Sequence, residues 1–201
     1  MYIQHFVGLI HHPKEEWEEI VEEKYSIVQC YLRYIMWLAA IPAVSVYIGT
    51  TQVGWSLGGR GDTVLLTEAS ALPIAISFYF VLLGAVGAMA YAMYWMEHTY
   101  GVDASLERCF MLTTFTATPM MLAGLAGLYP VMWFDVMVGL AAITYTLKLL
   151  ITGVPILGHI SEERGFMFSM SVVTVGLCVL VAVLAITVIL WSSITPPVFI
   201  R

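Results

Sequence analysis

Four long stretches of this sequence contain no charged residue, and each is long enough to cross a lipid bilayer. They are residues 34–59, 69–96, 109–134 and 165–200. A helix of about 20 apolar residues spans the roughly 30 Å of bilayer hydrocarbon. A water-soluble fold could not cover so much apolar surface, because soluble monomers rarely expose apolar patches above a few hundred Å². The pattern therefore predicts an all-α, polytopic membrane protein.

A fifth, weaker span is predicted between the last two stretches. It covers residues 131–153 and is interrupted by Asp135 and Lys148. Pro130 ends the preceding helix, and Pro155 is expected to follow the end of the weaker one, because proline is typical of the residues just beyond a helix. We therefore predict five transmembrane helices, with four as the alternative.

The composition restricts the class of protein further. Of the 201 residues, 60% are hydrophobic and 11% are charged, whereas about 25% charged residues are usual in a soluble domain. Five spans of about 20 residues use about half the chain, which leaves no room for a second folded domain. Soluble catalytic domains and disulfide scaffolds are thereby excluded. The sequence has no basic patch of the kind that binds nucleic acid, so we expect no nucleic-acid partner.

Residues 1–29 precede the first apolar stretch and are predicted to contain an amphipathic helix. Pro13 fits its first turn, where a missing backbone N–H costs little, and Trp17, Ile20 and Val21 follow at helical spacing. Six glutamates occupy the rest of the circumference: Glu15, Glu16, Glu18, Glu19, Glu22 and Glu23. Anionic lipid attracts basic helices and would repel this one, so we expect its Trp17 face to pack on the spans; docking of a partner protein is the alternative. The chain then divides into a cytoplasmic leader, residues 1–29, and a membrane domain, residues 30–201.

Lysine and arginine residues are distributed unevenly between the two sides of the predicted bundle. The side of the N-terminus carries six of the eight, and the opposite side carries only Arg60 and Arg201. Because positive residues near the span ends favour the cytoplasmic side, we predict a cytoplasmic N-terminus and an extracytoplasmic C-terminus.

Charged residues within spans are the first candidates for function, because burying a charge in a bilayer is costly. Asp135 and Lys148 lie about 20 Å apart along one helix, so they cannot pair with each other. Asp135 falls in the first turn, where the helix dipole favours a carboxylate, and Arg60 is its expected partner. Lys148 can extend its ammonium group toward the nearer interface. A structural role therefore explains both residues.

A collar of charged residues is predicted at the cytoplasmic ends of the spans. Glu97, Arg108 and Arg164 belong to it, and with Asp135 and Lys148 they complete the set of candidate functional polar residues. Charges solvated at the interface are one interpretation of the collar, and a cytoplasmic vestibule is the other. No metal or cofactor is expected, because the histidines and the three cysteines lack metal-ligand spacing.

Several segments of the sequence resemble one known family. They are HHPKEEWEEI (residues 11–20), TATPMMLAGLAGLYP (116–130), ITYTLKLLITGVPIL (143–157) and SEERGFMFS (161–169). Together they resemble the Yip1 domain superfamily, and most closely its compact bacterial inner-membrane branch, long described as a domain of unknown function. The motif residues that carry the resemblance are Pro13, Trp17, Pro119, Gly124, Pro130, Tyr145, Gly153 and Pro155.

The resemblance implies five transmembrane helices in a bacterial inner membrane, with the N-terminus in the cytoplasm. Eukaryotic relatives are tied to vesicle traffic and small GTPases and carry a longer N-terminal region. This sequence lacks that region, so we do not expect the trafficking role.

The sequence contains no nucleophile elbow, no phosphate-binding loop and no paired carboxylates in a span, so we expect a non-enzymatic protein. The leading hypothesis is a membrane-organising scaffold that interacts with lipid, with copies of itself or with another membrane protein. The alternative is a small-solute or ion transporter or channel that uses the polar residues at the helix ends. A transporter needs a polar cavity near the bilayer midplane, and that feature distinguishes the two.

Overall fold

The computed structural model describes residues 5, 8–9, 11–23, 25–54, 64–102, 104–193 and 196–200. Its elements follow one another along the chain as α2 (Pro13–Glu23), α3 (Ile27–Cys30), η1 (Tyr31–Ile35), α4 (Met36–Ile48), η2 (Gly49–Val53), β1 (Leu65–Leu66), α5 (Glu68–Tyr100), α6 (Leu106–Ala123), η3 (Gly124–Leu128), α7 (Met132–Gly158), α8 (Glu162–Ser193) and β2 (Phe199–Ile200).

Within the described residues, five helical segments are long and apolar enough to cross a membrane: Ile27–Val53, Glu68–Tyr100, Leu106–Leu128, Met132–Gly158 and Glu162–Ser193. The predicted all-α class and the count of five are confirmed. The first segment begins before residue 34 because the Ser26 side chain and Gln29 form a capping box there. It ends before residue 59 because Gly54 takes a left-handed φ of 75° after the π-helical turn η2.

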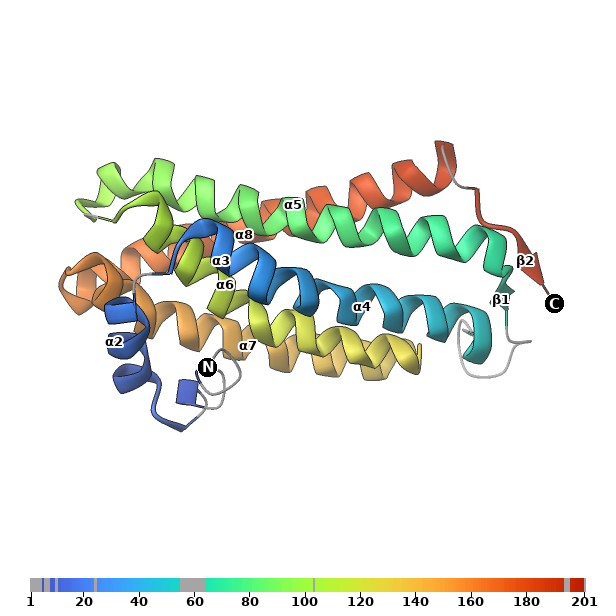
Figure 1. Cartoon of the computed structure of the whole chain (residues 1–201), viewed down its shortest axis with the longest axis horizontal. Coiled ribbons are helices and arrows are strands. Elements are labelled where there is room, and N and C mark those ends of the chain that lie inside the picture. Colours follow the sequence, from blue (N-terminus) through green and yellow to red (C-terminus); the bar gives the residue numbers. More distant parts are fainter. Residues whose placement is uncertain are drawn as a thin grey trace.

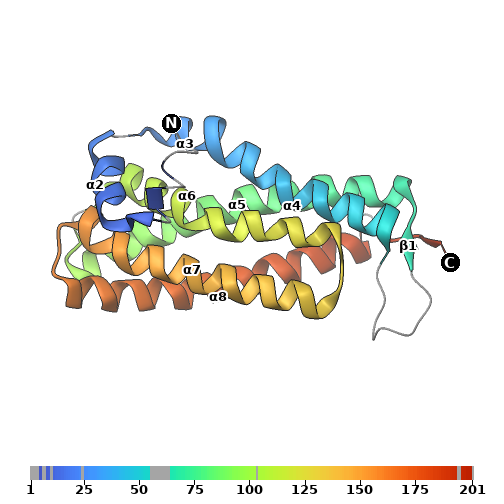
Figure 2. The same ribbon diagram turned by 90° about the horizontal axis from the view of Figure 1, so that it is seen from below.

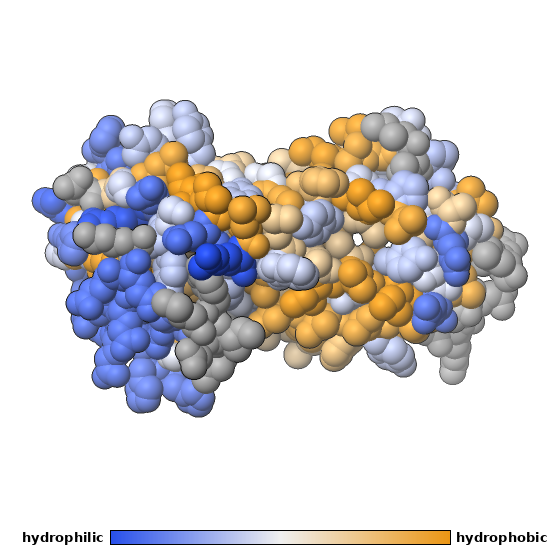
Figure 3. Space-filling model, in the orientation of Figure 1, coloured by the Kyte–Doolittle hydropathy of each residue, from blue (hydrophilic) through white to orange (hydrophobic). Residues whose placement is uncertain are grey.

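The five long segments lie side by side in one elongated bundle (Figures 1 and 2). Helix α2 packs across one end, beside the connections α5–α6 and α7–α8; we call this the α2 end. Hydrophilic residues gather there, and a broad hydrophobic band covers the middle of the face shown in Figure 3. At the opposite end, β1 and β2 pair antiparallel, with Leu65 opposite Ile200 and Leu66 opposite Phe199.

Two helix ends differ from the sequence prediction. Pro155 was expected beyond the fourth span but lies inside α7, which continues to Gly158 and is ended by His159 at a left-handed φ of 48°. Proline removes one helical hydrogen bond, and its ring here packs against Gly165 of α8, where an added Cβ would lie 2.5 Å from Pro155 Cγ. Helix α8 ends at Ser193 rather than residue 200, because two prolines follow and the chain then becomes extended.

Glycines allow two helical segments to approach closely near the end opposite α2. A Cβ on Gly124 of η3 would lie 2.4 Å from Cβ of Pro42 in α4. A Cβ on Gly49 would lie 1.8 Å from the carbonyl oxygen of Gly127 and 3.4 Å from Cδ of Pro130. Small residues let membrane helices meet backbone to backbone, and Gly124 and Pro130 both lie at this contact.

Candidate functional site

The leader helix α2 is held on the bundle by Trp17. This side chain is completely buried and lies against Gly153 of α7, where an added Cβ would be 2.7 Å from Trp17 Cε2. Ile20, one turn later, is also fully buried, whereas most of the glutamates of α2 are exposed. The face of α2 that carries Trp17 and Ile20 therefore packs on the spans. Two motif residues from distant segments, Trp17 and Gly153, form one contact.

Phe115 of α6 is the centre of a buried aromatic cluster beneath the leader. Its ring centroid lies 6.0 Å from that of His5, 6.2 Å from Trp17, 6.3 Å from Tyr25 and 5.4 Å from Tyr34. The His5 and Trp17 rings meet it edge to face, an arrangement that adds to the energy of burial. His5 and Phe115 were not predicted from the sequence, because their contacts join segments far apart in the chain.

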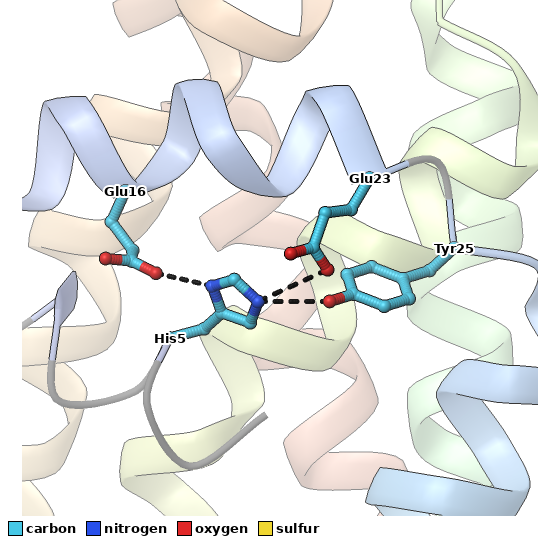
Figure 4. Close-up of polar contacts among 4 residues, drawn as sticks. All are labelled: His5, Glu16, Glu23 and Tyr25. Atoms are coloured by element: carbon cyan, nitrogen blue, oxygen red, sulfur yellow. Dashed lines mark hydrogen bonds and ion pairs between the residues drawn. The ribbon is translucent and has the colours of Figure 1, made fainter. Parts of the chain in front are cut away.

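His5 also forms the centre of a polar network (Figure 4). Its Nδ1 donates to a carboxylate oxygen of Glu16, while its Nε2 lies 3.0 Å from the Tyr25 hydroxyl and 3.4 Å from Glu23 Oε2. In neutral His5, Nε2 accepts from Tyr25; in protonated His5, it can donate to Glu23. The His5 side chain is 7% exposed. The network thus ties His5 to two turns of α2 and to Tyr25, which lies just before the first span.

The same network contains a set of residues with metal-binding chemistry. Ligand atoms of His5, Glu16 and Glu19 lie within 4.8 Å of one another, and imidazole with carboxylates is a donor set that zinc uses. The hydrogen bond from His5 to Glu16 already uses the Nδ1 position. Both ring nitrogens of His5 therefore have partners within the protein. That the protein binds no metal remains a prediction.

Tyr145 of α7 binds the N-terminal segment through a hydrogen bond to its backbone. Its hydroxyl donates to the carbonyl oxygen of Leu9 at 2.9 Å, and Leu9 is fully buried.

The Lys148 ammonium lies 5.7 Å from the centre of the Tyr145 ring, within the range of a cation–π contact. Because α7 continues past Pro155, Lys148 lies about 15 Å from the helix end at Gly158, deeper than the sequence predicted. Lys148 is exposed there and lies beside the ring of Tyr145, whose hydroxyl binds the N-terminal segment.

Asp135 is half-buried in the first turn of α7, at the end of the bundle opposite α2. That position agrees with the prediction that the helix dipole favours its carboxylate. Its expected partner, Arg60, lies outside the described residues. Asp135 and Lys148 therefore occupy different levels of one helix and do not form a common site.

The charged collar at the α2 end is only partly exposed. Arg164 is exposed at the start of α8, whereas Glu97 is 4% exposed, because α5 runs on to Tyr100 and carries Glu97 inside the bundle end. A His98 nitrogen lies 3.8 Å from a Glu97 oxygen. Arg108 donates to the carbonyl oxygen of Leu157 in the last turn of α7 at 3.4 Å, where a cation complements the helix dipole. Glu97 is thus not the water-solvated charge that was expected.

Pro119 is buried in α6 beside a polar contact. The hydroxyl oxygens of Tyr34 and Thr118 lie 2.8 Å apart, and Thr118 donates to the carbonyl oxygen of Thr114 at 3.3 Å. Pro13 opens α2 and Lys14, next to it, forms an exposed 3.3 Å ion pair with Glu162 of α8. Pro119 thus lies in the packed interior of the bundle, whereas Pro13 lies beside a contact between α2 and α8.

A cavity of about 260 Å³ lies between α5, α6, α7 and α8. Its lining is almost entirely apolar, and neither Asp135 nor Lys148 belongs to it. Two of its three threonines, Thr113 and Thr116, donate to backbone carbonyls of their own helix at 2.8 and 2.7 Å. Other residues of the lining include Met89, Met121, Leu147, Leu150, Val172 and Leu180.

Comparison with known proteins agrees with this architecture. The Yip1 domain family matches residues 7–183. The inner membrane protein YohC of Escherichia coli K12 is 39% identical over 190 residues, which cover 94% of this chain and 97% of that protein. YohC of Escherichia coli O6:H1 strain CFT073 matches with the same identity and coverage. No solved structure matches the chain. The family match and the relatives, which extend over nearly the whole bundle, show that the chain belongs to the Yip1 domain family.

Proposed function

We propose that this protein is a non-enzymatic component of a bacterial inner membrane that organises its surroundings through contacts with lipid and with other membrane proteins. The observation that carries the proposal is the apolar character of the cavity between α5, α6, α7 and α8. A cavity of this kind offers hydrocarbon a site and offers an ion no ligand. The similarity to two inner membrane proteins supports the location.

The distribution of the charged side chains favours a scaffold over a transporter. Transporters place substrate and ion sites near the bilayer midplane, where polar groups from several helices converge. Here Asp135 lies at one end of α7, Lys148 is exposed beside the Tyr145 ring, and neither lines the cavity. The bias of lysine and arginine supports a cytoplasmic N-terminus.

Flux measurements on purified protein in proteoliposomes test the proposal. Preformed gradients of protons, sodium and potassium are expected to decay at the rate of protein-free vesicles, and the double variant Asp135→Asn/Lys148→Met is expected to behave identically. A gradient that collapses only with the native residues would replace the scaffold with the transporter. Native mass spectrometry of protein released from nanodiscs is the positive measurement, with retained phospholipid as the expected result.

A further inference from the structure

We propose that the cavity between α5, α6, α7 and α8 binds one hydrocarbon chain of a bilayer phospholipid. This inference rests on the proposed lipid-interacting function and assigns it a site. It follows from the depth of the cavity, the chemistry of its lining, its opening toward the bilayer and its size.

The cavity lies at the depth of the bilayer hydrocarbon. At the α2 end its lining begins at Met93, seven residues before α5 ends at Tyr100, and at Leu150, eight residues before α7 ends at Gly158. At 1.5 Å per residue, the cavity begins about 10 Å inside the bundle. Phospholipid chains surround helices at that depth, whereas glycerol and phosphate groups remain near the interfaces.

The lining offers water too few polar partners. A buried water needs two to four of them. The hydroxyls of Thr113 and Thr116 already donate to the carbonyls of Cys109 and Leu112, so among the described lining residues only the Thr146 hydroxyl is without a hydrogen-bond partner. None of the described lining residues is charged. An empty cavity would deprive its walls of dispersion contacts on one side. Hydrocarbon supplies those contacts and requires no hydrogen bond.

The cavity opens toward lipid along α8. Leu177 and Leu180 belong to its lining, and their side chains are 55% and 37% exposed. Because α8 is a transmembrane helix, exposure at these positions means contact with the bilayer. A lipid chain can therefore enter sideways without leaving the hydrocarbon phase.

The volume fits a chain segment and excludes larger occupants. An apolar cavity of about 150 Å³ is large enough to bind benzene, and this one measures about 260 Å³. A helix from a second copy, roughly 10 Å across, is too wide to enter. Side chains of a second copy are the remaining competitor, and the experiment below separates them from lipid.

Gly176 provides a variant that fills the cavity. It lies in the lining on α8, and an added Cβ would meet only Met89 Cε, at an ordinary contact distance of 3.7 Å. Gly176→Leu therefore has room for its first atom and extends into the cavity. Gly84→Leu on α5 is the matched control, because Gly84 lies outside the lining and an added Cβ there has no neighbour within 4 Å.

Photocrosslinking in vesicles tests the proposal. The full-length protein is reconstituted in dioleoyl phosphatidylcholine doped with phosphatidylcholine that carries a diazirine within one acyl chain, irradiated, and mapped by peptide mass spectrometry. We expect adducts at the lining residues Met89 and Met121 in addition to adducts at the exposed Val188. If the new leucine displaces roughly two chain methylenes, Gly176→Leu should lower the lining adducts about tenfold and leave those at Val188 unchanged. Gly84→Leu should retain the native map.

Several outcomes would overturn the inference. If the native protein gave no adducts at the lining, an acyl chain would be excluded from the cavity. The same conclusion would follow if the lining adducts persisted in a folded Gly176→Leu variant. Protein–protein crosslinks at the lining would assign the cavity to a second copy. Should Gly176→Leu fail to fold, Ala117→Leu on the α6 wall provides the same test. Ion flux together with lining adducts would overturn the proposed function alone, whereas adducts at Val188 without adducts at the lining and without flux would overturn this inference alone.

Discussion

Replacing Gly153 of α7 by alanine tests whether close packing against Trp17 holds the leader helix on the bundle. The new Cβ would lie 2.7 Å from Trp17 Cε2 and 2.8 Å from Leu112 Cδ1, well inside contact distance. Both neighbours are buried, and the Trp17 ring is held edge to face against Phe115. The indole therefore cannot move aside without giving up its own packing, and α2 must shift.

The size of the effect follows from two opposing contributions. Overpacking of a filled core costs about 1–3 kcal/mol, and the higher helix propensity of alanine returns up to about 1 kcal/mol. Gly139→Ala in the same helix gains the propensity alone, because an added Cβ at Gly139 has no neighbour within 4 Å. The difference between the two variants isolates the overpacking, so Gly153→Ala should be less stable than Gly139→Ala by about 1–3 kcal/mol.

Unfolding in detergent micelles, followed by circular dichroism, measures this difference. Trypsin cleavage after Lys14, which is exposed on α2, reports release of the leader and should accelerate in Gly153→Ala. Trp17→Phe has a smaller ring and should recover part of the loss when combined with Gly153→Ala, giving a non-additive double-mutant cycle. Equal stability of the two glycine variants, or strict additivity in the cycle, would refute the packing argument.

Three further predictions concern the polar residues and the topology. Tyr145→Phe removes the hydrogen bond to Leu9 and should lower the free energy of unfolding by about 0.5–1.5 kcal/mol; an unchanged unfolding midpoint would contradict it. Asp135→Asn and Lys148→Met should each insert normally in membrane fractionation and change stability by about 0.5 kcal/mol or less, whereas failure to accumulate in the membrane would assign them an essential role. Reporter fusions should place the N-terminus in the cytoplasm and the C-terminus on the other side; both reporters on one side would be inconsistent with five spans.

The candidate site could be predicted from the sequence only in part. Trp17, Tyr145 and Gly153 belong to the segments that resemble the Yip1 family, and each forms a contact that holds the leader in place. His5 and Phe115 carry no local signal, since a histidine near a chain end and a phenylalanine in an apolar helix are common. Their importance arises only in the folded protein, where the His5 and Phe115 rings meet edge to face beneath α2.

The sequence by itself determined the five spans, and it predicts an apolar face on the leader helix. Both depend on local properties, namely the length of an apolar run and the helical period, which neighbouring residues fix without reference to the rest of the chain. Tertiary structure decided the course of α7 through Pro155, the burial of Glu97 and the cavity among four helices. These features depend on which surfaces meet, and the hydrogen bond between Leu9 and Tyr145 joins residues 136 positions apart. No local pattern specifies such a pairing, because it results from the combined packing of all five helices.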